Sequence, residues 1–176
     1  MPDWRALSQD LLQHGIVVDA GNRPEPVAGG DINAAWRLAT SAGRVFLKTS
    51  DASRIDMFSA EADGLRALAG ANAVRVPQVI ACGIAGTTSY IAMEWLQFAR
   101  ATRDMEEVLG RQLAKMHRTR AERHGWHRDN TIGLTPQPNA WSDDWIAFFR
   151  EQRLIHQLRI AASNGFGGEL QREGMQ

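Results

Sequence analysis

The sequence has few of the features that mark disulfide-bonded, membrane or nucleic-acid-binding proteins. Its single cysteine, Cys82, cannot form a disulfide within the chain. No apolar run approaches the ~20 residues that span a bilayer, and residues 1–15 lack the apolar core of a signal peptide. The formal net charge is +0 and the pI is about 7.0, so no general attraction to nucleic acid or anionic lipid is predicted. We expect a cytoplasmic protein that binds neither nucleic acid nor membrane.

Motifs for common hydrolytic and metal chemistry are also missing. No Gly-x-Ser-x-Gly nucleophile elbow occurs. His124 and His127 lie three residues apart, but Cys82 is in a distant segment and cannot complete a zinc site. His117 has no partner at ligand spacing and is predicted to favour the dipole at a helix C-terminus or to pack in the core. We therefore predict no metal site within the chain.

Of the 176 residues, 44% are hydrophobic. Their spacing differs between the first and second halves of the chain. The first half predicts strands at 33–40, 44–49, 76–84 and 89–95 with helices at 3–13 and 55–69. The second half predicts helices at 105–118 and 141–162 around a Gly/Asn/Pro-rich loop at 125–139. The change near Leu96–Gln97 predicts an α+β fold with two lobes, 1–96 and 97–176. Ligands often bind between such lobes.

Lys48 is a charged residue at a strand position that faces inward if both faces of the sheet are covered. It shares a face with Phe46, and an unpaired buried charge is costly. The alternative is an ordinary surface lysine at a strand end. The loop "AGGDIN" (28–33) precedes the hairpin, and Glu61 follows on the next predicted helix. Protein kinases use this order of Gly-containing loop, strand lysine and helix glutamate.

Two further segments allow a functional and a structural interpretation. Glu94-Trp95-Leu96 is either a hinge whose backbone reads an adenine edge or a plain linker, and the residues alone favour neither. The tryptophans of the second half could form a stacking surface, but packing is the preferred interpretation. We therefore predict that an aromatic stripe in the last helix is buried. Three of its residues are spaced i, i+4 and i+7, and a fourth widens the stripe. Its members are Trp141, Trp145, Phe148 and Phe149.

Five motifs are "GGDINAAWRL", "FLK" ending at Lys48, "FSAEADGLRAL" around Glu61, "VRVPQVIACG" and "MEWL". With them the sequence resembles the fructosamine kinase family, also called ketosamine 3-kinases, whose fold is protein-kinase-like and aminoglycoside-phosphotransferase-like. The most specific part of the resemblance is "GWHRDNTIGLTPQPNAWSDDWIAFFREQRLIHQL" (125–158), which kinases in general lack.

The resemblance implies ATP-dependent phosphorylation of a sugar hydroxyl in fructosamines or other ketosamines on glycated proteins or amines, which is a deglycation repair. It implies ATP and Mg²⁺ as cofactors. Lys48 would hold the α- and β-phosphates and Glu61 would orient it, while the loop 125–141 would support the substrate side. The remaining ATP-binding residues implied are Gly29, Gly30, Asp31, Ile32 and Asn33 over the phosphates, and Glu94, Trp95, Leu96 and Gln97 at the adenine. Because Asp31 stands where some members carry a redox-active cysteine, no disulfide-switched dimer is expected.

One departure from the family pattern concerns catalysis. The family's His-Gly-Asp catalytic loop and Asp-Pro metal motif do not occur in these residues. Catalytic groups and Mg²⁺ ligands are therefore expected outside this chain, which would hold a complete β-rich lobe and a truncated helical lobe and would be inactive alone. The alternatives are an inactive nucleotide-binding or interaction module, and a fragment of an aminoglycoside- or choline-type kinase, against which the segment 125–156 argues.

Overall fold

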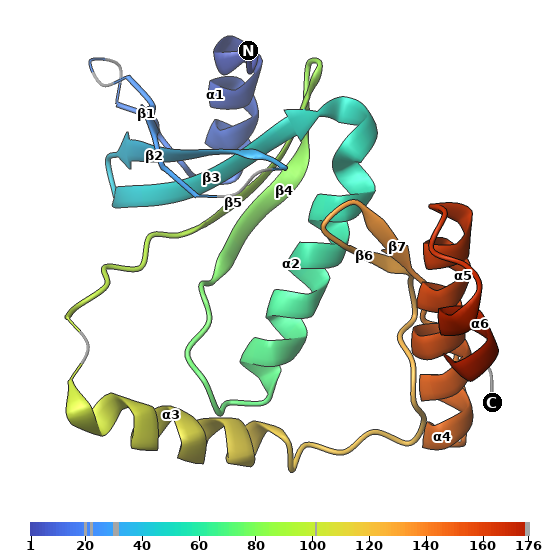
Figure 1. Cartoon of the computed structure of the whole chain (residues 1–176). Coiled ribbons are helices and arrows are strands. Elements are labelled where there is room, and N and C mark those ends of the chain that lie inside the picture. Colours follow the sequence, from blue (N-terminus) through green and yellow to red (C-terminus); the bar gives the residue numbers. More distant parts are fainter. Residues whose placement is uncertain (20, 22, 30–31, 101, 175–176) are drawn as a thin grey trace. The chain divides into compact units, whose positions relative to one another are not determined.

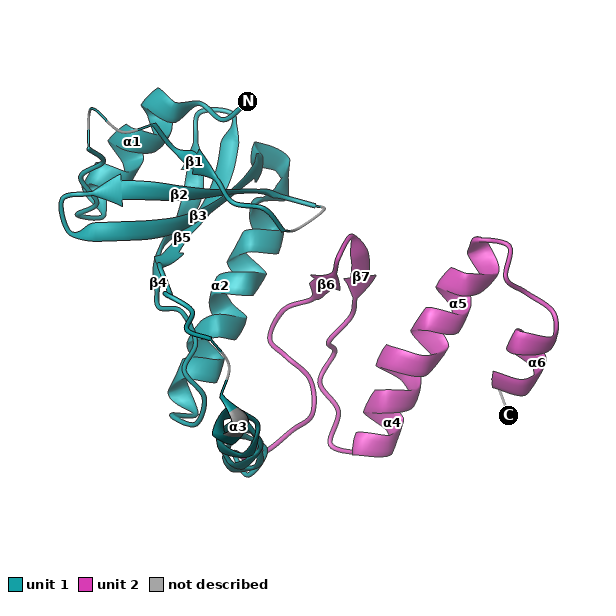
Figure 2. Cartoon of the chain, turned by 60° about the vertical axis from the view of Figure 1, so that its left-hand side comes forward, with its two compact units in different colours: residues 1–119 teal, residues 120–176 magenta. Residues whose placement is uncertain are grey.

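A computed structural model describes residues 1–19, 21, 23–29, 32–100 and 102–174. The chain forms two compact units, residues 1–119 and residues 120–176, which Figure 2 colours separately. The lobe boundary predicted near Leu96–Gln97 stays a prediction.

Unit 1 is built on a five-stranded antiparallel sheet with strand order β1-β2-β3-β5-β4 (Figure 1). The central hairpin turns at Gly43, whose φ of +118° suits a residue without a Cβ. Buried and partly exposed residues alternate along β3, whereas Thr88 to Met93 of β5 are all buried. Because successive side chains of a strand point to opposite faces, each face of the sheet has an apolar set. The strands are β1 (Glu25–Pro26), β2 (Ala34–Thr40), β3 (Gly43–Asp51), β4 (Val79–Ala85) and β5 (Thr88–Glu94).

Two helices cover opposite faces of this sheet (Figure 1). Helix α1 (Trp4–Gln13) begins at Asp3, whose carboxylate accepts the Ala6 N–H, and it buries Leu7 and Leu11 against one face. Helix α2 (Ile55–Gly70) follows a 3₁₀ turn and buries Phe58 and Ala62 against Ile91 and Met93 on the other face. The sheet thus has a separate core on each side, and the α2 side carries Lys48.

Helix α3 (Arg103–Met116) completes unit 1. Lys115 near its C-terminus donates to the Asn72 carbonyl oxygen at 2.8 Å, which ties the helix to the end of α2. The apolar residues that were predicted from helical spacing fall on one face, but Val108, Leu109 and Leu113 are exposed. Periodicity therefore located the helix correctly without showing whether its apolar face is covered.

Unit 2 consists of a small hairpin followed by helices. Asp144 caps the first helix by accepting the Ala147 N–H at 2.6 Å. A π-helical segment, Arg150–Ile155, interrupts the long predicted helix. The elements are β6 (Asn130–Ile132), β7 (Thr135–Gln137), α4 (Trp145–Phe149), α5 (His156–Ser163) and α6 (Glu169–Gly174). The hairpin lies within the segment predicted to be a loop, and α6 lies in a tail for which no helix was predicted.

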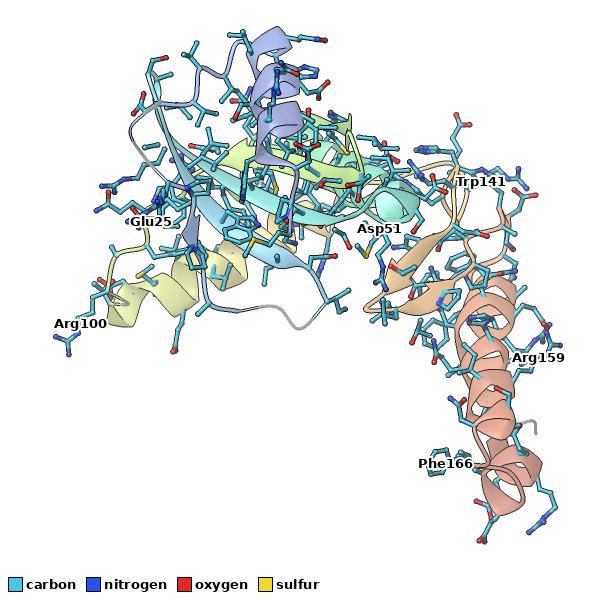
Figure 3. All side chains as sticks on the ribbon, turned by 90° about the horizontal axis from the view of Figure 1, so that it is seen from above. Glu25, Asp51, Arg100, Trp141, Arg159 and Phe166 are labelled. Atoms are coloured by element: carbon cyan, nitrogen blue, oxygen red, sulfur yellow. The ribbon has the colours of Figure 1, made fainter. Side chains whose placement is uncertain are left out.

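The aromatic stripe of unit 2 corrects one prediction. Phe148 is buried, at 6% exposure, as expected. Trp141, Trp145 and Phe149 are 45%, 54% and 41% exposed, so the predicted burial of these three is wrong. Trp145 packs on Phe148, Phe149 and His124, with ring centroids 5.9, 5.5 and 5.4 Å away, and not under a further element. Figure 3 shows Trp141 and Phe166 at the surface.

Candidate functional site

Lys48 and Glu61 form an ion pair on the α2 side of the sheet. The pleat of β3 points Lys48 to the same face as Phe46, and the Lys48 Nζ lies 2.6 Å from the Glu61 Oε1 on α2. This confirms the predicted pairing. The two side chains are 30% and 29% exposed, so water screens the pair and its contribution to stability is small. Its main consequence is orientation, because the carboxylate fixes where the ammonium points.

The ion pair lines a cavity of about 420 Å³ that lies within unit 1. Its walls combine apolar side chains from the sheet and α2 with the segment that leaves β5. Such a volume, with apolar walls and few polar groups, is typical of small-molecule sites. The lining residues are Val27, Phe46, Lys48, Glu61, Leu65, Pro77, Met93, Glu94, Trp95, Leu96 and Phe98. Five of them, Lys48, Glu61, Glu94, Trp95 and Leu96, were predicted from the sequence.

The β5 linker, Glu94-Trp95-Leu96, is held from the β4 side. The Glu94 N–H donates to the Gln78 carbonyl oxygen at 2.8 Å, and the Glu94 carboxylate accepts from the Arg75 guanidinium and from the Gln78 N–H, the latter at 3.4 Å. The Glu94 N–H is thus already used within the fold. Recognition of a ligand by backbone groups would fall to the residues that follow, Trp95 and Leu96.

The predicted glycine-containing loop is described only in part, because Gly30 and Asp31 lie outside the described residues. Gly29 has a φ of +111°, a conformation strained for residues with a Cβ. Ile32 does not line the Lys48 cavity. It lines a second cavity of about 600 Å³ together with Trp36 on the side of the sheet that faces α1.

Gly29, Asn33 and Gln97 are the other described residues of the predicted site that do not line this cavity. Gln97 is exposed one residue beyond Leu96. The Asn33 Nδ2 lies 3.9 Å from the Met57 Sδ on α2, and its buried Oδ1 has no hydrogen-bond partner among the described residues. The sequence analysis placed Phe46 on the same face as Lys48 by strand alternation, but it did not assign Phe46 or the other apolar residues to a cavity wall.

The predicted substrate-side loop (125–141) is held by a polar network within unit 2. Asn139 is buried: its N–H donates to the Asp129 Oδ1 at 2.8 Å, and its Nδ2 donates to the Asn130 Oδ1 at 3.0 Å. The Arg153 guanidinium donates to the Asn139 Oδ1 and to the Pro138 carbonyl oxygen, both at 2.6 Å. Burial of this guanidinium lowers the pKa of Arg153. The hairpin therefore has its own buried polar anchor, Asn139.

Metal-binding and membrane-spanning features can be assessed only over the described residues. Within that part of the chain, no three His, Cys, Asp or Glu side chains gather in a way that could hold a metal ion. That the ligands of Mg²⁺ lie outside this chain stays a prediction. No helix in the same part is long and apolar enough to cross a bilayer.

Comparisons with known proteins agree with the geometry. A family model described as fructosamine kinase matches residues 4–174. A protein-ribulosamine 3-kinase from Arabidopsis thaliana is 39% identical over 163 residues, which are 89% of this chain and 50% of the relative. The crystal structure of a candidate fructosamine-3-kinase from Haemophilus somnus superposes with a TM-score of 0.84 at 30% identity. The superposition covers 94% of this chain and 57% of the Haemophilus somnus chain.

A second solved structure, a candidate fructosamine-3-kinase from Thermobifida fusca, gives a TM-score of 0.76 at 29% identity over 93% of this chain and 56% of that chain. The mixed α/β, kinase-like fold predicted from the sequence is confirmed by these neighbours. The chain spans about half the length of the curated relatives it matches. Since the family model extends over nearly all of the 176 residues, the chain belongs to the fructosamine kinase family.

Proposed function

We propose that this chain supplies the ATP-binding lobe of a ketosamine kinase. The observation that carries the proposal is the 2.6 Å ion pair between Lys48 and Glu61 in the wall of an apolar cavity. A strand lysine oriented by a helix glutamate is the arrangement by which protein kinases hold nucleotide phosphates. The predicted lobe, residues 1–96, contains every ATP-binding residue expected of this chain except Gln97.

Each side chain has a distinct role in this proposal. Lys48 places a positive charge for the phosphates, and Glu61 keeps it from swinging to solvent. The apolar walls, including Val27, Phe46 and Met93, would exclude water from an adenine ring. Backbone groups of Trp95 and Leu96 would bind the edge of the base, since the Glu94 N–H is engaged by Gln78.

The acceptor is proposed to be a ketosamine sugar on a glycated protein or small amine. Support comes from family membership and from the ribulosamine 3-kinase named among the relatives. The anchored segment 125–141 is the part of this chain proposed to face that substrate. Protein kinases use a catalytic-loop Asp as the base and further Asp and Asn side chains as Mg²⁺ ligands. We expect the corresponding groups outside this chain, because the family's His-Gly-Asp and Asp-Pro motifs do not occur in it.

Calorimetric titration of the purified chain with ATP and Mg²⁺ tests the proposal. Charge-assisted hydrogen bonds contribute about 1.5–3 kcal/mol, so Lys48→Ala should weaken ATP binding by roughly 10- to 100-fold. Lys115→Ala is the matched control, because Lys115 is the other lysine of the chain and contacts the Asn72 carbonyl. Equal ATP affinities for the wild-type protein and Lys48→Ala would contradict the proposed site.

A further inference from the structure

A row of side chains crosses the whole sheet at the level of the cavity. Paired strand positions place Glu25, Arg37, Phe46, Met93 and Val79 side by side on β1, β2, β3, β5 and β4. Residues directly opposite one another in antiparallel strands point to the same face, which here is the face toward α2. Phe46 and Met93 line the cavity. Glu25 and Arg37, the charged end of the row, therefore lie on the same face of the sheet as the cavity.

Arg37 connects the edge of the sheet to the β5 linker. Its guanidinium pairs with the Glu25 carboxylate and lies over the Trp95 ring, 5.7 Å from the ring centroid. The Trp95 ring also packs on Phe46, with 6.2 Å between centroids. Trp95 is thus held against a cation and an aromatic ring that are themselves cross-strand neighbours. Figure 3 labels Glu25, whose strand β1 forms the edge of the sheet.

These contacts join two walls of the same cavity. Glu25 lies in β1, two residues before Val27, and the Val27 N–H donates to the Ala35 carbonyl oxygen at 2.9 Å. Val27 and Trp95 both line the cavity. The chain of contacts from Glu25 through Arg37 to Trp95 therefore fixes the start of the glycine-containing loop and the linker with respect to each other.

The exposure of the ion pair argues against a mainly stabilising role. The Arg37 and Glu25 side chains are 33% and 61% exposed, and exposed ion pairs add little to stability. The ring that Arg37 holds lies between Glu94, already fixed by Gln78, and Leu96. Fixing the Trp95 ring therefore restricts the backbone of the two residues proposed to bind the base.

We propose that Glu25, Arg37 and Trp95 form a clasp on the nucleotide cavity, and that Arg37 is a positioning residue for the adenine part of the ligand. The inference rests on the proposed ATP site. Arg37 acts through Trp95 and not by touching phosphate. The clasp should therefore influence ligands that contain a base and leave ligands that consist only of phosphate unaffected.

Titration of wild-type protein and Arg37→Ala with ATP and with inorganic tripolyphosphate tests the clasp. Loss of one cation–π contact should weaken ATP binding by about two- to fivefold, while tripolyphosphate, held by Lys48, should bind both proteins equally. Arg37→Lys keeps the cation and should restore most of the affinity. The control is Arg111→Ala, which removes the exposed Arg111–Glu107 ion pair on α3 and should change neither ligand. Equal ATP affinity in Arg37→Ala, or an equal loss for both ligands, would overturn the role in adenine positioning.

Hydrogen exchange separates this inference from the proposed function. In the protein without ligand, Arg37→Ala should speed amide exchange in a peptide covering residues 94–98 by about two- to fivefold, and leave a peptide from β4 unchanged. Unchanged exchange at 94–98 would overturn the clasp even if ATP binds. Conversely, a wild-type protein that binds tripolyphosphate but not ATP would overturn the proposed ATP site, whatever the exchange result.

Discussion

Tyr90 and Asp10 link β5 to α1 on the face of the sheet opposite Lys48. The Tyr90 ring is fully buried, and its O–H donates to the Asp10 Oδ2. Burial, reinforced by the hydrogen bond to the carboxylate, raises the pKa of Tyr90. The neutral phenol is therefore a condition for docking α1 on the sheet.

This pKa shift predicts a loss of stability in alkaline solution. An unfolded tyrosine titrates near pH 10, whereas the folded protein keeps the proton to higher pH. The contribution of Tyr90 should be constant below about pH 9 and should fall by up to about 1.4 kcal/mol per pH unit above about pH 10. Urea unfolding of wild-type protein and Tyr90→Phe from pH 8 to pH 11 measures the difference. Parallel stability curves for the two proteins would refute this account.

The positions of single site residues were predictable from the sequence where strand alternation or charge pairing determines them. The pairing of Lys48 with Glu61 follows from strand alternation and from the cost of an unpartnered inward charge. The place of Ile32 was not predictable in this way: the strand that follows it sets which face it reaches, and it lines the cavity beside Trp36. A loop residue has no alternation of its own from which to predict that face.

Among the elements, the β6–β7 hairpin depends on one arginine in the π-helical segment. Arg153 donates to the Pro138 and Asn139 oxygens at 2.6 Å and lies 4.8 Å from the centroid of the Phe148 ring. A π-helical turn changes the angular spacing of side chains along a helix. The π-helical turn therefore directs the Arg153 side chain toward the hairpin. A regular α-helix would direct this side chain elsewhere.

Replacing this arginine should loosen the hairpin. Arg153→Met removes two charge-assisted hydrogen bonds and leaves the Asn139 oxygen unsatisfied, so we expect a local loss of about 2–4 kcal/mol. Amide exchange of residues 135–139 measures it directly. Arg150→Met is the matched control, since Arg150 pairs with the neighbouring Glu151 and both side chains are exposed. Unchanged protection of 135–139 in Arg153→Met would show that the hairpin is anchored in another way.

The elements that the sequence failed to predict share a physical cause. Strands β6 and β7 have three residues each, and neither is long enough to show an alternating pattern. Helical spacing placed the stripe of Trp145 and Phe149 on one face, but spacing does not reveal whether another element covers that face. The longer elements, such as α2 and the β2–β3 hairpin, were predicted because many residues agree on one period.

At the scale of the whole molecule, the chain spans about half the length of its relatives. It also exposes several large apolar side chains. Phe98, Val108 and Leu109 are exposed in unit 1, and Ile146 is exposed in unit 2. The carboxylates of unit 2 that could be considered for catalysis already have structural roles: Asp129 holds Asn139, Asp143 pairs with Arg123, and Asp144 caps α4.

The chain alone is accordingly predicted not to phosphorylate a ketosamine. Each missing preorganised electrostatic group typically costs ~10²–10³ in rate. The described part of the chain holds no metal-ligand cluster, and the family's His-Gly-Asp and Asp-Pro motifs do not occur in the sequence. The 176-residue protein with ATP, Mg²⁺ and a fructosyl-lysine peptide should give no phosphopeptide by mass spectrometry, whereas a full-length family member assayed in parallel should. Robust turnover by the 176-residue protein would mean that carboxylates such as Asp129, Asp143 or Asp144 act in catalysis.

The composition of the chain allows a direct test of the nucleotide site, because Lys48 and Lys115 are its two lysines. An acyl-phosphate derivative of ATP transfers its acyl group to a lysine amine that lies beside the bound phosphates. Peptide mass spectrometry should find this group on Lys48, and an excess of ATP should abolish the labelling there while leaving any reaction at Lys115 unchanged. Labelling of both lysines to the same extent, with no protection by ATP, would contradict the assignment of Lys48 as the phosphate-binding residue.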